Sequence, residues 1–180
     1  MPHHGHAILE DHHGRNALRF ERALLHTPER VWRALTSSDE LSHWHPTPFE
    51  LDASPPTPGC AVRFITTEGG PEIPAGELLQ YDPPRALAYT WGEDELRWEL
   101  RPDGAGCVLR LTHVFDDHFK AARDGTGWHL CLAALSESLD GSPQPKRGSG
   151  PRLPEGWEEL NREYQQRFGI APEQATPPPL

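Results

Sequence analysis

The stretches LAYTW at residues 87–91, LRWELR at 96–101 and LRLTH at 109–113 decide the fold of this 180-residue chain. In each stretch, large apolar or aromatic residues alternate with charged or small ones. Because successive side chains of a β-strand point to opposite sides, the alternation predicts three strands that share one apolar face. Glycine-containing turns at 92–94 and 103–106 separate them, which favours antiparallel pairing.

A helical pattern follows the third strand, over about residues 126–140. One face of this helix carries Trp128, Cys131, Leu132, Leu135 and Leu139. A curved antiparallel sheet covered by one long helix can enclose a cavity. We therefore expect a small-molecule pocket between the two.

The residues before these strands predict one strand, two short helices and several shorter strands. Residues 18–25 form the first strand, and Thr27 caps a helix that Pro28 begins. Residues 37–40 form a capping box for a second short helix, which Pro46 ends. Short strands around 49–52, 60–66 and 75–81 bring the predicted sheet to six to seven strands.

Composition predicts the domain organisation. A histidine-rich leader at 1–16 precedes the main domain at 17–141. A Pro/Gly-rich linker at 142–154 leads to a tail helix at 155–169, and residues 170–180 are expected to be disordered. The tail helix is a candidate contact for a protein partner or a dimer.

The net charge of -10 argues against nucleic acid and anionic membranes as partners, because both favour basic surfaces. Membrane insertion is not expected either, since no apolar run is long enough to span a bilayer. Without a signal-peptide pattern, the prediction is a cytoplasmic protein. The three cysteines are widely spaced and predict no disulfide framework. No motif predicts a cofactor or a metal site.

Several separated motifs resemble one protein family. They are TPERVWRALT at 27–36 with Leu41 and Trp44, GxL at 76–78, DPPRxLxYxW at 82–91, LTH at 111–113, GW at 127–128, and the tail residues Gly156, Trp157, Tyr164 and Phe168. In this order they resemble the START-like SRPBCC superfamily, in particular the homologues of the heat-shock-protein ATPase activator. The resemblance covers about residues 17–169.

The resemblance implies an α+β helix-grip fold. A curved antiparallel sheet of six to seven strands wraps a long C-terminal helix, with two short helices after the first strand. Members of the family hold apolar molecules in a cavity between sheet and helix. The candidate ligand-binding residues are Arg22, Phe64, Tyr89, Trp91, Trp98, Leu111, His113, Trp128, Leu132 and Leu135.

Arg22 and His113 are the polar candidates. Each shares strand parity with apolar neighbours, and the resembling fold places their strands side by side, so we expect the two to meet. Together they would anchor a ligand carboxylate or hydroxyl. A buried arginine needs a partner, which Glu77 or Gln80 could supply; their opposite parity lets only one face inward. His113 is also the candidate catalytic residue, as a general base.

The leading function is the binding of an apolar or amphipathic small molecule, such as a lipid, a polyketide or an aromatic metabolite. One alternative is a cyclase- or hydrolase-like enzyme that uses His113. Another is a protein-interaction or co-chaperone-like module working through the tail helix. The activator's signature belongs to a separate N-terminal domain, for which this chain is too short. Binding without turnover is the favoured hypothesis, and enzyme activity stays open.

Overall fold

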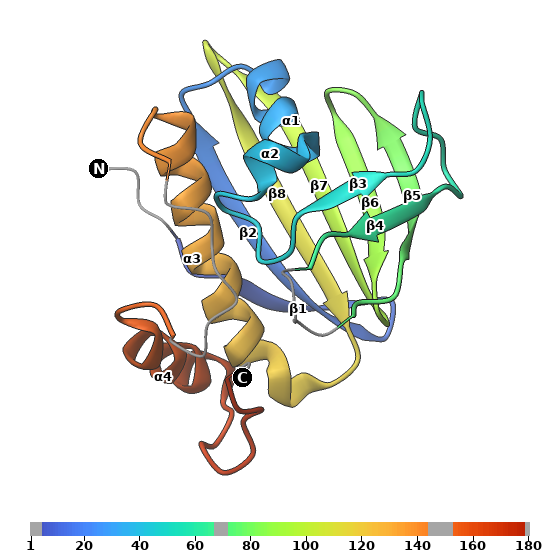
Figure 1. The fold of residues 1–180 in the computed structure, drawn as a ribbon. Coiled ribbons are helices and arrows are strands. Elements are labelled where there is room, and N and C mark those ends of the chain that lie inside the picture. Colours follow the sequence, from blue (N-terminus) through green and yellow to red (C-terminus); the bar gives the residue numbers. More distant parts are fainter. Residues whose placement is uncertain (1–4, 67–71, 144–152, 179–180) are drawn as a thin grey trace.

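The computed structural model describes residues 5–66, 72–143 and 153–178. In this part of the chain, eight strands form one antiparallel sheet in the order β1-β2-β8-β7-β6-β5-β4-β3, curved around the long helix α3 (Figure 1). The strands are β1 (Ile8–His12), β2 (Arg15–Leu24), β3 (Phe49–Leu51), β4 (Ala61–Phe64), β5 (Gly76–Asp82), β6 (Ala86–Trp91), β7 (Asp94–Asp103) and β8 (Gly106–Phe115). This confirms the α+β helix-grip prediction.

The helices are α1 (Pro28–Thr36), α2 (Ser38–Leu41), the 3-10 turn η1 (His118–Lys120), α3 (Ala121–Leu139) and α4 (Trp157–Phe168). Thr27 caps α1 as predicted, since its hydroxyl accepts the backbone N–H of Arg30 at 3.3 Å. The capping box of α2 is wrong, because the Ser37 side chain makes no capping hydrogen bond. Arg30 and Arg33 instead each donate to the Glu40 carboxylate at 2.7 Å. None of the described helices is long and apolar enough to cross a membrane.

Strand β1 belongs to the sheet although its residues lie in the predicted leader. It pairs with β2 from Ile8 opposite Arg19 to His12 opposite Arg15. At the other end of the chain, Ile170 is buried, and the backbone N–H of Thr176 donates to the carbonyl of Phe119 at 3.1 Å. The prediction of disorder for residues 170–180 comes from their proline content, from which such long-range contacts cannot be predicted.

The core lies between α3 and the inner face of the sheet. The sheet contributes Leu18, Phe20, Leu87, Tyr89, Leu96, Trp98, Leu109 and Leu111, and α3 contributes Trp128, Leu132 and Leu135. Burial of these apolar side chains is the main favourable term in folding. The predicted alternation of β6, β7 and β8 is the pattern that aims them inward.

Helix α4 packs against α3 (Figure 1), where Gly125 provides the space. A Cβ atom at Gly125 would lie 3.3 Å from the Tyr164 ring. The Thr126 hydroxyl donates to the side-chain oxygen of Asn161 at 3.3 Å, and Trp157 is buried. The apolar face predicted for the tail helix is therefore covered by its own chain.

Two glycines of α3 should respond oppositely to substitution. Gly125→Val should destabilise the protein by about 1–3 kcal/mol, because the branched side chain displaces the Tyr164 ring. Gly127→Ala should stabilise it by about 0.5–1 kcal/mol, since its Cβ meets no atom and alanine favours helix. Urea unfolding of both variants measures the difference. Equal effects of the two substitutions would contradict this packing of α4.

Candidate functional site

Aromatic side chains gather between β6, β7, β4 and α3. Trp128 of α3 lies 5.6 Å from Trp98 and 6.0 Å from Trp91, between ring centroids. Phe64 lies 6.0 Å from Trp91 and 6.4 Å from Tyr89. These five residues, all predicted as ligand-binding, form what we name the aromatic cluster. Leu111, Leu132 and Leu135 are buried in the same core.

His45 completes the aromatic cluster and was missed by the sequence analysis. It is 1% exposed, and its ring centroid lies 5.4 Å from that of Trp128. Its Nδ1 accepts the backbone N–H of Thr47 at 3.1 Å, which leaves the proton of a neutral ring on Nε2, 3.0 Å from the Tyr89 hydroxyl. No periodic pattern marks His45, because it follows α2 in a loop.

The Tyr89 hydroxyl is a polar group in apolar surroundings. Besides His45, it accepts the indole N–H of Trp98 at 3.4 Å. Burial raises the pKa of Tyr89, so the hydroxyl stays protonated at neutral pH. A protonated phenol that already accepts two donors has its own proton to offer an acceptor.

His113 links α3 to the sheet. Its Nδ1 accepts the indole N–H of Trp128 at 3.1 Å, and its Nε2 lies 2.8 Å from Oδ2 of Asp94. Because an indole N–H can only donate, the proton of a neutral imidazole must reside on Nε2 and be donated to Asp94. The Lys120 ammonium contacts the same Asp94 oxygen. We name these four residues the His113 network.

The partners of Asp94 stabilise its negative charge. Burial alone would raise the pKa of Asp94. The hydrogen bonds from His113 and Lys120 lower this pKa by more than burial raises it, so the net shift is downward. The carboxylate is therefore ionised at neutral pH, and His113 lies between an anion and an indole.

Asp94, His113 and Asp124 place one potential ligand atom each within 4.8 Å of one another. The His113 network does not suit a metal ion. The nitrogen that faces the carboxylates carries the proton, whereas a ligating nitrogen must be bare. Lys120 also contacts Asp94 and lies 3.7 Å from Asp124, so its ammonium already neutralises the pair.

The lone pair that a general base would use is engaged as well. It lies on Nδ1 of His113, where Trp128 donates. His113 could accept a substrate proton only after that hydrogen bond breaks.

Arg22 does not meet His113 as expected. In the register of β2 and β8, Arg22 lies opposite Leu109 and His113 opposite Leu18, four residues away, which is about 13 Å along a strand. Glu77 and Gln80 do not reach Arg22 either. A bulge between Leu78 and Gln80 breaks the parity argument, and both residues are exposed.

Arg22 is 5% exposed, and its Nη1 donates to the carbonyls of Gly5 and Glu21, each at 2.9 Å. Its Nε and Nη2 are buried and have no hydrogen-bond partner among the described residues. Burial lowers the pKa of Arg22. A guanidinium nevertheless stays charged in proteins, so this charge is buried without an anionic partner in the described chain.

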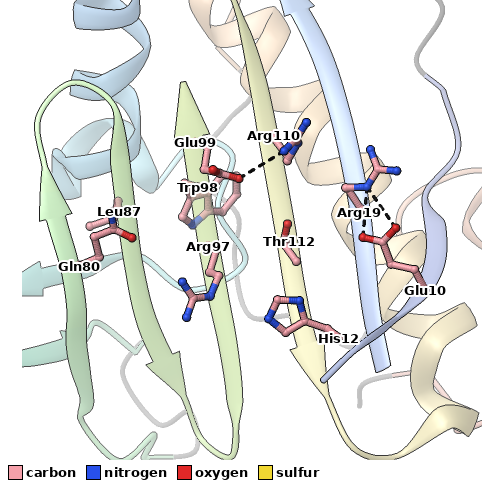
Figure 2. Close-up of a pocket in the computed structure, with 10 residues that line it drawn as sticks. All are labelled: Glu10, His12, Arg19, Gln80, Leu87, Arg97, Trp98, Glu99, Arg110 and Thr112. Atoms are coloured by element: carbon pink, nitrogen blue, oxygen red, sulfur yellow. Dashed lines mark hydrogen bonds and ion pairs between the residues drawn. The ribbon is translucent and has the colours of Figure 1, made fainter. Parts of the chain in front are cut away.

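A hollow of about 560 Å³ lies on the opposite, outer face of the sheet (Figure 2). It is lined by Glu10, His12, Arg19, Gln80, Leu87, Arg97, Trp98, Glu99, Arg110 and Thr112. Its arginines are paired with carboxylates: Arg19 with Glu10, Arg110 with Glu99 and Glu21, and Arg97 with Glu95. Such a lining does not suit an apolar ligand.

Residues 25–140 match the family described as Activator of Hsp90 ATPase homolog 1-like protein. The solved structure of the protein encoded by gene BPP1335 of Bordetella parapertussis is 30% identical to this chain, with a TM-score of 0.66, and the match covers 92% of this chain and 91% of the other. No curated protein matches the chain.

Two further solved structures are similar at lower identity. The conserved protein of unknown function EF2215 from Enterococcus faecalis is 17% identical, with 92% of each chain covered and a TM-score of 0.69. CalU16 from Micromonospora echinospora is 19% identical, with 91% of this chain and 93% of the other covered and a TM-score of 0.66. At these identities the likeness concerns the fold.

Asp94→Asn tests the His113 network. At pH 7 the variant should lose about 1–3 kcal/mol of unfolding free energy, because Lys120 loses the nearer of its two carboxylate partners. A carboxylate with a lowered pKa stabilises the fold above its unfolded pKa of about 4 and loses this contribution as the pH falls through its folded pKa. The acid-linked loss of stability below about pH 4 should therefore be smaller in Asp94→Asn than in the wild type.

The control is Asp103→Asn at the exposed far end of β7. Chemical denaturation between pH 2 and 7 measures all three proteins. Parallel stability curves for the wild type and Asp94→Asn would contradict the role given to Asp94.

Proposed function

The chain belongs to the family of Activator of Hsp90 ATPase homolog 1-like proteins, and we propose that it binds an apolar or amphipathic small molecule between the sheet and α3. The ligand class is a lipid, a polyketide or an aromatic metabolite. Phe64, Trp91, Trp98, Leu111, Trp128, Leu132 and Leu135 are the proposed apolar lining, with Tyr89, His113 and Arg22 as polar contacts.

The observation that carries the proposal is the make-up of the aromatic cluster. A core that only stabilises needs apolar side chains, whereas this one buries the Tyr89 hydroxyl and the imidazoles of His45 and His113. Hydrogen bonds among these groups and their neighbours offset the cost of burying them. A few placed polar groups in an apolar lining are typical of ligand sites. Trp91 is partly buried, so its ring is the part of the aromatic cluster that reaches the surface.

The contacts of His113 and of α4 favour binding over the two alternatives. A His113-dependent cyclase or hydrolase needs the lone pair that Trp128 engages. A partner of the tail helix would need the apolar face of α4, where Trp157 and Tyr164 are buried. A cytoplasmic location is part of this proposal, and the odd number and wide spacing of the three cysteines support it.

An NMR titration tests the proposal. Labelled protein is titrated with a panel of fatty acids, sterols, flavonoids and polyketide-like aromatics, and the indole N–H signals are followed. Saturable shifts are expected at Trp91, Trp98 and Trp128, because these line the proposed site, while Trp32 and Trp157 serve as remote controls. Silence of all indoles across the panel would contradict the proposed function.

A pair of variants locates the site. Trp91→Ala should weaken the affinity for whichever panel compound binds, since it removes a half-exposed wall of the aromatic cluster without opening the deep core. Phe119→Ala, which removes an exposed ring outside the aromatic cluster, should leave the affinity unchanged. Isothermal titration calorimetry measures both. Equal affinities of the two variants would place the ligand elsewhere.

A further inference from the structure

Residues 5–7, which we name the N-terminal strap, connect β2 to the two C-terminal helices. On the sheet side, the carbonyl of Gly5 accepts from Arg22 at 2.9 Å. On the helix side, the backbone N–H of Ala7 donates to the Tyr164 hydroxyl, and His6 pairs with Glu163, both at 3.0 Å. The strap therefore joins Arg22 of β2 to α4, beyond the point where β1 stops pairing with β2.

The buried Arg22 lies under this strap, and its guanidinium is held by one side only. In the described chain, both hydrogen bonds of the group, to the carbonyls of Gly5 and Glu21, use Nη1. The Phe20 ring lies 5.5 Å from the guanidinium carbon and supports its position. Nε and Nη2, the two nitrogens without a partner in the described chain, form the edge of a guanidinium that binds a carboxylate through two parallel hydrogen bonds.

A buried charge without a counter-charge is costly, and carbonyl oxygens compensate a cation less well than a carboxylate does. The unfilled edge of Arg22 thus has the geometry and the charge of a site for an oxyanion. The Tyr164 hydroxyl is near enough to interact with the guanidinium electrostatically. Along the sheet the neighbours of Arg22 are apolar: Leu109 lies opposite Arg22 on β8, and the next row of the sheet joins Phe20, Leu111 and Trp98. Two strand spacings, about 10 Å, separate Phe20 from Trp98 along this row.

We propose that Arg22 binds the carboxylate of an amphipathic ligand through Nε and Nη2, and that the N-terminal strap closes over this end of the ligand. The inference rests on the proposed function, to which it adds the acidic head group and its place of entry. The apolar part of the ligand lies along the row from Phe20 to Trp98 and reaches the aromatic cluster. Entry requires the strap to lift, which breaks its hydrogen bonds to Arg22, Tyr164 and Glu163.

Sodium decanoate and 1-decanol test the proposal, because they share a chain length and differ in head group. The wild type should bind decanoate about tenfold or more tightly than decanol, as expected for hydrogen bonds to a charged group. In the same titration, the NMR signal of the Arg22 Nε–H should shift with decanoate and saturate with the indoles. This signal needs no substitution, so the test does not depend on a variant that folds.

Arg22→Met should bind both compounds with equal affinity, because it keeps the apolar stem and removes the charge. The matched control is Arg19→Met, on the outer face of the same strand, which should keep the preference for the acid. Tyr164→Phe removes the acceptor of the Ala7 N–H and should raise the association rate of decanoate, measured by stopped-flow tryptophan fluorescence.

The outcomes separate the two proposals. Equal binding of decanol and decanoate by the wild type, with indole shifts, would overturn the role of Arg22 and leave the proposed function standing. An acid preference that Arg19→Met abolishes would move the carboxylate to the outer face and also overturn the inference. No binding of either compound, together with silent indoles across the wider panel, would overturn the proposed function itself.

Discussion

The hydrogen bond from the Trp128 indole to Nδ1 of His113 is the contact on which the interior of this protein depends. It settles the tautomer of the imidazole, and with it the donor that Nε2 presents to Asp94. Asp94 in turn pairs with Lys120, directly before α3. A single chain of contacts thus connects the middle of α3, two strands of the sheet and the start of the same helix. This sets how closely α3 lies over the aromatic cluster.

The two faces of the sheet differ in how they treat charge. The outer face spreads arginines and glutamates in paired rows, which water solvates and which cost little to build. Among the described residues, the inner face holds the charged pair of Asp94 and Lys120 beside His113, and Arg22, whose Nε and Nη2 have no anionic partner there. An unpaired buried charge costs folding free energy. An anionic ligand would therefore stabilise the protein most by binding on the inner face, beside Arg22.

Local sequence pattern predicts those parts of the structure that local physics determines. The alternation in β6, β7 and β8 and the apolar stripe on α3 can be recognised in the sequence, because periods of 2 and 3.6 residues are characteristic of strands and helices. The packing of Tyr164 on Gly125 escapes prediction, because it joins segments distant in sequence. β1 pairs with the neighbouring β2 across a two-residue turn, but its sequence ILEDH has no clear alternation of apolar and polar residues. The site shows the same limit. Trp91, Trp98 and Trp128 come together as the parity of their elements suggests.

Contacts that depend on how two strands pair in register cannot be predicted from local sequence patterns. Asp94 reaches His113 because β7 and β8 pair in one particular register. The β5 bulge leaves both Glu77 and Gln80 exposed, although their opposite parity would have let one of them face inward. His45 enters the aromatic cluster from a loop, and a loop has no periodic sequence pattern from which its position could be predicted.

The most direct test of this account is the protonation pattern of His113, measured from its ring ¹⁵N shifts and proton couplings at neutral pH. The expected result is a proton on Nε2 and a bare, hydrogen-bonded Nδ1. The Trp128 indole signal should correspondingly show a donor protected from exchange. A proton on Nδ1 would be incompatible with the indole donating there, and would contradict the link between α3 and the sheet on which the rest of the interior depends.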